Sequence, residues 1–396
     1  MLYRRFGRTG LQMPVFSCGG MRYQDKWQDV PFEEIDQESH QNLVRTISRS
    51  IEVGINHIET ARGYGSSERQ LGQVLPDYPR EKLIVQTKIG PTETGGEFRK
   101  DFLDSLSRLR LGHVDLLAIH GINDREGFER SVRPGGCLEM ARQLQKEGLA
   151  RHIGLSTHGP LDLLLDIVRH EKNGGFDYIN LHWYYIFQKN WPAIEEATRR
   201  DMGIFLISPT EKGGMLFNPS ARLTELTAPL HPIVFNDLFC LSRPEVHTLS
   251  LGAARPEDFD LHVEATRLYD KRHELLPPIE ARLREAWRDT LGEFGETFDE
   301  GLPEWHETPG GINMRVIVWL YALAKAYDMV EYGKMRYNLL GNAGHWFPGE
   351  KADKLDEVDL SQALANSPWK DRIPAVLREA DEILGGEPVK RLSQST

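Results

Sequence analysis

The feature that most constrains the fold is an alternation of short apolar runs and predicted helices across residues 1–270. Short apolar runs bounded by polar turns predict buried strands, and helices between such strands favour parallel pairing. Eight strands suit a closed barrel better than an open sheet, so we predict an α/β fold, a (β/α)8 TIM barrel. The predicted strands lie at residues 15–18, 55–58, 83–88, 114–119, 152–156, 177–182, 203–207 and 246–251.

Further elements are predicted at both ends of this repeat. Segments 3–6 and 11–13 flank a Gly-Arg-Thr-Gly turn and predict an N-terminal β-hairpin. After residue 275 the composition changes, and Pro277-Pro278 is expected to break the chain before a series of helices. We therefore predict two domains, a barrel at residues 1–270 and a mostly helical C-terminal extension at 271–396. The long connection at 209–245 is predicted to form a lid.

Composition excludes several classes of protein. The formal net charge of -11, without a basic stripe, argues against binding to nucleic acid or to an anionic membrane. The three cysteines, Cys18, Cys137 and Cys240, are far apart, which argues against a disulfide framework and fits a reducing compartment. No apolar segment typical of a signal peptide follows the basic N-terminus, so we expect a cytoplasmic protein. The most apolar long run, 312–330, includes charged residues and predicts a buried helix.

The strongest chemical signal lies in segment 54–72. Its glycine-flanked loop carries Glu59 and Tyr64 just past a predicted strand, and the next two strands end in Lys88 and His120. In a (β/α)8 barrel the loops after the strands form the catalytic face. The four side chains are therefore expected to converge on one mouth.

These residue types suit the reduction of a carbonyl, which needs a hydride donor and an acid. Tyr64 can be the acid, because a nearby ammonium such as that of Lys88 lowers the pKa of a phenol from its ordinary value of about 10. Glu59 would hold Lys88 and balance its charge. His120 would donate a hydrogen bond to the substrate oxygen and orient the carbonyl.

The same segments resemble the signature of the aldo-keto reductases. The matching motifs are Gly-Ile-Asn-(x)2-Glu-Thr-Ala-(x)2-Tyr-Gly-(x)2-Glu, Thr-Lys and Asp-Leu-Leu-(x)2-His. The resemblance implies an NAD(P)H-dependent oxidoreductase that interconverts a carbonyl (aldehyde, ketone or sugar) and an alcohol. It implies Tyr64, Lys88 and His120 as catalytic residues, with Glu59 in place of the family's aspartate and longer by a methylene.

The resemblance also implies which later segments hold the cofactor. Ser156 and Thr157 match the family's Ser-Asn pair at the nicotinamide, with threonine replacing asparagine, and Asn180 replaces a glutamine in the same role. Segments 207–214 and 251–258 resemble the loops at the pyrophosphate and the adenosine phosphate. The implied cofactor-binding residues are Gly20, Met21, Ser156, Thr157, Asn180, Ser208, Pro209, Thr210, Lys212, Gly214, Gly252, Arg255 and Asp258.

Two observations bear on the choice of cofactor. Arg255 can bind a 2′-phosphate whereas Asp258 would repel one, and the balance favours NADP over NAD. A Rossmann site is not expected, because no G-x-G-x-x-G follows a strand and Glu68 replaces the third glycine after Gly63-Tyr-Gly65.

Aromatic residues and the extension complete the expectations. Trp27, Trp183 and Tyr184 can form a substrate wall, or they can be structural packing. The extension loosely resembles that of a subgroup of aldo-keto reductases carrying a [4Fe-4S] cluster. No cysteine follows Cys240, so no cluster is expected there.

Two other functions stay open at this stage. A dinucleotide-binding regulatory subunit with little catalysis is suggested by Glu59 and by the size of the extension. A metal-dependent barrel hydrolase is suggested by His57, His120 and His182, which end or follow strands, although the main hypothesis needs no metal. The expected partner is a small-molecule carbonyl or alcohol, and the sequence leaves open the substrate's identity and homo-oligomer formation.

Overall fold

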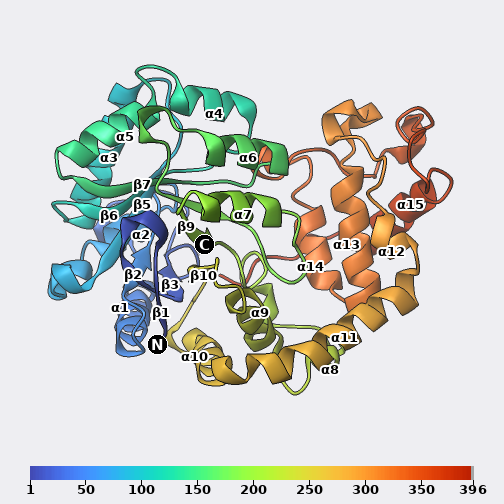
Figure 1. The fold of residues 1–396 in the computed structure, drawn as a ribbon, viewed down its shortest axis with the longest axis horizontal. Coiled ribbons are helices and arrows are strands. Elements are labelled where there is room, and N and C mark those ends of the chain that lie inside the picture. The colour runs from blue at the N-terminus through green and yellow to red at the C-terminus, as the bar shows by residue number, and fades with distance from the viewer. Residues whose placement is uncertain (394–396) are drawn as a thin grey trace. The chain divides into compact units, whose positions relative to one another are not determined.

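The computed structural model describes residues 1–393, which form two compact units (Figure 1). The first unit comprises Met1–Gly214, Asn236–Asp270 and the described residues from Leu392 onward. The second comprises Met215–Phe235 and Lys271–Arg391. Each unit therefore contains segments that are not contiguous in the sequence. A single domain boundary between residues 270 and 271 stays a prediction.

The first unit contains a closed barrel of eight parallel strands, which confirms the predicted fold class. Each strand pairs with the next one along the chain, and the last closes on the first where Leu249 lies beside Phe16. The strands are β3 (Phe16–Gly19), β4 (His57–Glu59), β5 (Ile84–Ile89), β6 (Val114–Ile119), β7 (Ala150–Ser156), β8 (Tyr178–Leu181), β9 (Gly203–Leu206) and β10 (Thr248–Leu251).

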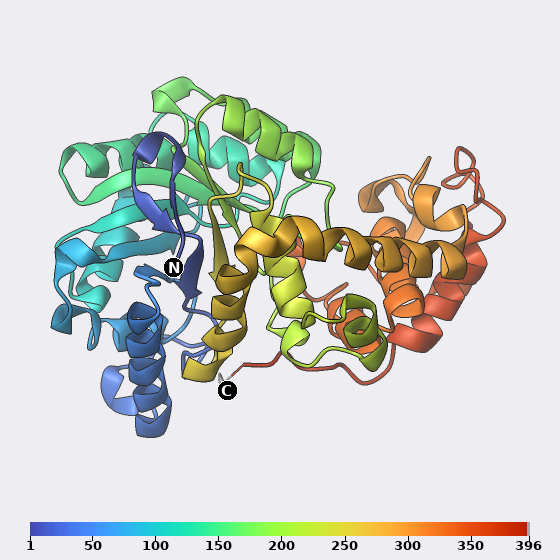
Figure 2. The same cartoon turned by 60° about the horizontal axis from the view of Figure 1, so that its bottom comes forward.

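An antiparallel hairpin of β1 (Tyr3–Arg5) and β2 (Gln12–Pro14) precedes the barrel, as predicted (Figures 1 and 2). Directly after β1, Phe6 is fully buried in a hydrophobic cluster with Ile84 and Tyr178, the first residues of their strands. A Cβ on Gly203 would lie 2.6 Å from the Phe6 ring, so this close approach requires glycine. The hairpin therefore covers the N-terminal end of the barrel and leaves the opposite end to the loops after the strands.

Helices join the barrel strands, and several begin at side-chain caps. Asp36 accepts a hydrogen bond from the Ser39 amide, and Thr94 and Glu97 form a capping box, which satisfies amides that a helix start leaves unpaired. The helices are α1 (Gln37–Glu52), α2 (Ser67–Leu71), α3 (Gly95–Leu109), α4 (Arg125–Val132), α5 (Cys137–Lys146), α6 (Leu161–Arg169), α7 (Trp191–Arg199) and α10 (Phe259–Leu268).

The connection after β9 contains two helices, α8 (Ala221–Thr227) and α9 (Pro232–Leu241). Residues 215–235 of this connection belong to the second compact unit. The role of the connection as a lid stays a prediction.

The second unit is mostly helical, as predicted. Its central helix, α13 (Met314–Tyr327), is buried along most of its length. It contacts α11 (Arg272–Leu291), α14 (Val330–Tyr337) and α15 (Ile373–Leu384). This helix corresponds to the apolar run, and no helix in the described part of the chain is long and apolar enough to cross a membrane. The short helix α12 (Phe294–Thr297) follows α11.

The prediction that Pro277-Pro278 breaks the chain is wrong, because both prolines lie inside α11. A proline inside a helix removes a backbone hydrogen bond and crowds the preceding turn, which costs about 3 kcal/mol. Here the same turn buries Leu276 and Ile279. We infer that the free energy gained by this burial offsets the cost of the prolines. A rule based on local sequence does not take such burial into account.

Candidate active site

The four residues expected at the barrel mouth come from three neighbouring strand ends. Glu59 is the last residue of β4, Lys88 is the penultimate residue of β5 and His120 directly follows β6. Tyr64 lies in the loop between β4 and α2. In this loop the backbone amide of Arg62 donates a hydrogen bond to the carbonyl of Lys88 at 3.0 Å, which connects the loop to β5. Pairing of adjacent strands thus sets the spacing of these groups.

The structure brings all four side chains together around Lys88. Its Nζ forms an ion pair with the carboxylate of Glu59 and donates to the Thr60 carbonyl at 3.0 Å. The same Nζ lies 3.4 Å from the hydroxyl of Tyr64. The Tyr64 ring meets the His120 ring edge to face, with centroids 5.5 Å apart. A phenol, an ammonium, a carboxylate and an imidazole therefore form one continuous group.

The lysine at the centre of this group is almost completely buried. Burial lowers the pKa of Lys88 well below its usual range, because the charged form loses its solvation. The adjacent carboxylate of Glu59 acts in the opposite direction by favouring the ammonium. The charged form of Lys88 is thus stabilised by an anion rather than by water.

The side chain of Glu59, which is one methylene longer than that of an aspartate, contacts Lys88 because the residue beside its carboxylate is a glycine, Gly19. Its second oxygen, Oε2, accepts a hydrogen bond from the hydroxyl of Ser250 at 3.0 Å. A Cβ on Gly19 would lie 3.0 Å from that oxygen and 2.7 Å from the Ser250 hydroxyl, which is closer than ordinary packing. The glycine therefore accommodates the longer carboxylate.

Ser156 and Thr157, predicted at the nicotinamide, position the loop that carries His120. The hydroxyl of Ser156 accepts from the Gly121 amide at 3.0 Å, and that of Thr157 donates to the Ile122 carbonyl at 2.7 Å. The Thr157 hydroxyl also accepts from the Gly159 amide. These contacts give both residues a local structural role, and their role at the nicotinamide stays a prediction.

The two predicted phosphate-binding segments converge on Arg22, a residue that the sequence analysis missed. Its side chain is buried, donates to the carbonyl of Gly252 and lies 3.5 Å from the carboxylate of Asp258. A Cβ on Gly214 would fall 2.4 Å from the guanidinium. Burial lowers the pKa of Arg22 to about 10. Arg22 directly follows Gly20 and Met21, two predicted cofactor-binding residues, and this position in the sequence could have indicated it.

Two neighbouring predicted residues, Arg255 and Asp258, are paired rather than opposed. The exposed Arg255 donates to Oδ1 of Asp258 at 3.2 Å, and Oδ2 accepts from the Ala254 amide at 2.8 Å. The carboxylate of Asp258 is therefore directed into the turn, which weakens the expected repulsion of a 2′-phosphate.

The remaining predicted residues of the cofactor loop lie in the turn after β9. Ser208 has a φ of +61°, unusual for a residue with a side chain, and the carbonyl of Pro209 accepts from Asn236 at 2.7 Å. Thr210 and Lys212 are buried in the same turn.

A family model supplies the identification. The model described as "Aldo/keto reductase family" matches residues 16–220, which is more than half of the 396 residues. The chain belongs to the aldo/keto reductase family.

Individual relatives agree with this assignment. L-glyceraldehyde 3-phosphate reductase from Escherichia coli (strain K12) is 28% identical over 177 residues, covering 40% of this chain and 46% of the relative. An aldo-keto reductase from Mycolicibacterium smegmatis is 30% identical over 186 residues, covering 46% and 60%. The chain thus spans about half the length of the curated relatives it matches.

Solved structures of the family share the fold. An aldo-keto reductase from Bacillus halodurans, solved in its holo form, aligns with a TM-score of 0.57 at 18% identity. The alignment covers 70% of this chain and 97% of that chain. At this identity the likeness shows the fold alone.

Aldo-keto reductases generally use NAD(P)H, and Asn180 offers a test of whether this chain fits such a cofactor. Asn180 lies in β8 and is fully buried, yet within residues 1–393 neither its side-chain nitrogen nor its oxygen has a hydrogen-bond partner. Buried amides are nearly always paired. A carboxamide has the matching acceptor and donor, so Asn180 fits the predicted role at the nicotinamide.

The three predicted substrate aromatics do not behave alike. Trp183 is buried and stacks on Phe239, with centroids 5.0 Å apart, which is the packing alternative that the sequence left open. Tyr184 is also buried, whereas Trp27 is 43% exposed. Only Trp27 is therefore directly available to a ligand in solution.

The histidines that suggested a metal site include His57, which is fully buried in the barrel. Its Nδ1 lies 2.5 Å from the hydroxyl of Ser17, and burial lowers its pKa to about 3. The described residues contain no group of three or more His, Cys, Asp or Glu side chains that could hold a metal ion.

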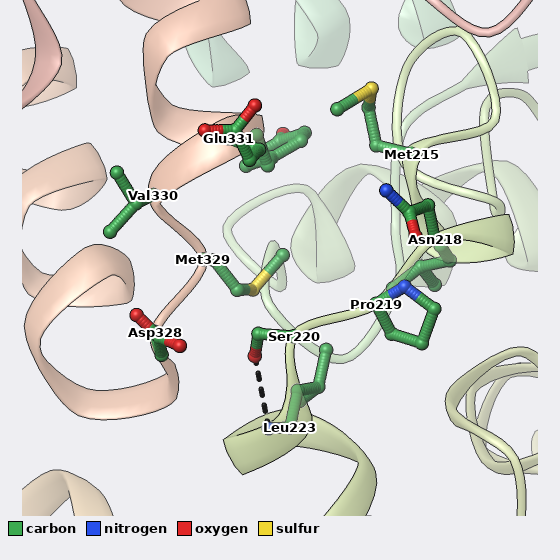
Figure 3. Close-up of a pocket in the computed structure, with 11 residues that line it drawn as sticks. Met215, Asn218, Pro219, Ser220, Leu223, Asp328, Met329, Val330 and Glu331 are labelled. Carbon is green, nitrogen blue, oxygen red and sulfur yellow. Dashed lines mark hydrogen bonds between the residues drawn. The ribbon is translucent and has the colours of Figure 1, made fainter.

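A separate cavity of about 310 Å³ lies within the second unit (Figure 3). Apolar side chains such as Met215, Leu223 and Met329 line it together with Asp328 and Glu331. None of the predicted catalytic or cofactor-binding residues belongs to this cavity.

Proposed function

We propose that this protein is an NAD(P)H-dependent oxidoreductase that interconverts a carbonyl and an alcohol, with Tyr64 as general acid and base. The observation that carries the proposal is the contact of the Tyr64 hydroxyl with a buried lysine at 3.4 Å. A phenol beside an ammonium can release its proton more readily, because the positive charge stabilises the phenolate. The carbonyl class includes aldehydes, ketones and sugars.

Each of the other groups supports that proton transfer. Glu59 keeps Lys88 charged in a buried site, where an isolated ammonium would lose its proton. His120, whose ring lies against that of Tyr64, orients the carbonyl oxygen toward the phenol by a hydrogen bond. Bound NAD(P)H would supply the hydride.

The same chain offers groups for each part of that cofactor. The unpaired amide of Asn180 suits the carboxamide, and Arg22 and Lys212 offer positive charge for the diphosphate. Arg255, which is exposed, can bind the 2′-phosphate, so we propose NADPH in preference to NADH.

The substrate proposal is coarser. One relative is named L-glyceraldehyde 3-phosphate reductase, which supports small aldehydes as the first compounds to test. A panel of small aldehydes, ketones and aldoses, assayed with both NADPH and NADH, covers the proposed class.

The test is the variant Tyr64→Phe, which removes only the hydroxyl. We expect a loss of turnover of roughly 10²- to 10⁴-fold, the usual contribution of a positioned acid, with the dissociation constant for NADPH nearly unchanged. Tyr78→Phe is the matched control, because Tyr78 is also half-buried but precedes β5, at the opposite end of the barrel. Unchanged turnover in Tyr64→Phe would overturn the mechanism. NADPH binding without turnover in the native protein would instead favour a regulatory subunit.

A further inference from the structure

The last described residues of the chain contact Arg22. The carbonyl of Leu392 accepts a hydrogen bond from Nε of Arg22, and the hydroxyl of Ser393 donates to the Arg22 carbonyl at 3.4 Å. Both residues belong to the barrel unit by their contacts. A segment far away in sequence thus occupies the surroundings of this buried arginine.

Those surroundings are the region that the proposed function assigns to the cofactor's phosphates, and the inference rests on that proposal. The guanidinium lies against Gly214, in the loop after β9, and donates to Gly252, in the loop after β10. Because a phosphate must contact these two loops to bind there, the Leu392 carbonyl and a phosphate oxygen would compete for the same guanidinium.

Three acceptors that surround the Arg22 guanidinium are weaker than a phosphate. The carbonyls of Leu392 and Gly252 are neutral, and the carboxylate of Asp258 is 3.5 Å away, which is long for an ion pair. A phosphate carries a negative charge and can accept two parallel hydrogen bonds from a guanidinium, whereas a carbonyl carries no net charge. An anion with two phosphates would therefore be the preferred partner of this group.

These last residues can leave without disturbing the helices. Residues 385–393 contain neither helix nor strand, and they are partly or fully exposed. Just before Leu392, the guanidinium of Arg391 lies 5.2 Å from the ring centroid of Trp346, within the second unit. Release of residues 392 and 393 therefore unwinds no helix or strand and leaves this anchor in place.

We propose that Leu392 and Ser393 form an autoinhibitory tail that competes with the phosphates of the dinucleotide for Arg22. Cofactor binds only those molecules whose tail is released, so the tail weakens the apparent affinity by the fraction of released molecules. High cofactor concentration displaces the tail, and a partner that captured the tail would activate the enzyme.

The first test compares the full chain with a chain that ends at Arg391. Tryptophan fluorescence measures the dissociation constants for NADPH and for inorganic diphosphate. We expect truncation to lower both constants by roughly tenfold, as for the loss of about two hydrogen bonds. A synthetic peptide of residues 385–396, added to the truncated chain, should raise the constants again.

The outcomes separate the two proposals. Equal or weaker binding by the truncated chain overturns the tail and leaves the proposed function standing. Failure of both chains to bind NADPH overturns the proposed function and the tail together.

A second readout uses the full chain without relying on affinity. Trypsin cleaves after the exposed Lys390, and this bond should be cleaved several-fold faster when NADPH is saturating, because the residues that follow it are then released. Adenosine, which lacks phosphate, is the control and should leave the rate unchanged. A cleavage rate that NADPH leaves unchanged or lowers would contradict displacement of the tail.

Discussion

The ammonium of Lys88 lies 3.4 Å from the hydroxyl of Tyr64 and 4.7 Å from the centroid of the same ring. The lysine is almost fully buried, and its charge is balanced by Glu59 on the neighbouring strand. This arrangement couples the chemistry of the phenol to the stability of the barrel, because the same ion pair serves both.

The variant Lys88→Met tests this coupling. It should lower kcat by roughly 10²-fold, as for the loss of one charge that stabilises the reacting group. It should also destabilise the fold by about 3–5 kcal/mol, because the carboxylate of Glu59 is left buried without its cation. Denaturant unfolding and turnover measure the two effects.

The double variant Glu59→Gln with Lys88→Met separates the effect on turnover from the effect on stability. Removing both charges should restore most of the stability but none of the activity. Activity that returned together with stability would show that Lys88 has only a structural role.

The variant Asn180→Leu should have opposite effects on stability and on cofactor binding. It removes a buried amide without partners in the described structure, so unfolding of the protein without cofactor should require about 1–3 kcal/mol more. The dissociation constant for NADPH should rise roughly tenfold, because the carboxamide loses its partner. Thermal unfolding and fluorescence titration measure these changes.

Asn190→Leu is the matched control. Asn190 is equally an asparagine and is buried, but its amide donates to the His182 carbonyl at 3.0 Å. Its replacement should therefore destabilise the fold. A destabilised Asn180→Leu, with unchanged NADPH affinity, would show that Asn180 is an ordinary core residue.

The variant Arg255→Ala tests the choice between the two dinucleotides. Arg255 is exposed and paired with Asp258, so its removal should change the fold little. The KM for NADPH should rise roughly tenfold while that for NADH stays constant, because only NADPH carries a 2′-phosphate. Arg267→Ala, at an exposed position on α10, is the control, and an equal change with both cofactors would argue against a phosphate contact.

Stability should fall in acid because of His57. Burial lowers its pKa from 6.5 to about 3, so the unfolded chain takes up the proton before the folded chain does. The contribution of neutral His57 is complete above pH 6.5 and is lost as the pH falls toward 3, at roughly 1.4 kcal/mol per pH unit.

Chemical unfolding between pH 4 and pH 7 measures this slope. The variant His57→Gln should flatten it, whatever the variant does to the overall stability. His306→Gln, at an exposed position, should leave the slope as in the native chain. An unchanged slope in His57→Gln would mean that other groups cause the loss of stability in acid.

The sequence by itself determined the barrel and the meeting of the four candidate catalytic side chains, because both depend on local patterns. Each strand is a short apolar run, and Glu59, Lys88 and His120 stand at the ends of such runs, where parallel pairing brings them together. The position of Tyr64 could be predicted in the same way, because Tyr64 lies in the loop that follows one of those strands.

Other features were decided only by tertiary structure, because they depend on contacts between distant segments. Burial of Leu276 and Ile279 lets α11 continue through its prolines, and packing against Phe239 places Trp183 in the interior. The surroundings of Arg22 combine the loops after β9 and β10 with the carbonyl of Leu392. Local propensity cannot predict contacts between distant segments, because the burial of a side chain and the charges around it depend on the fold of the whole chain.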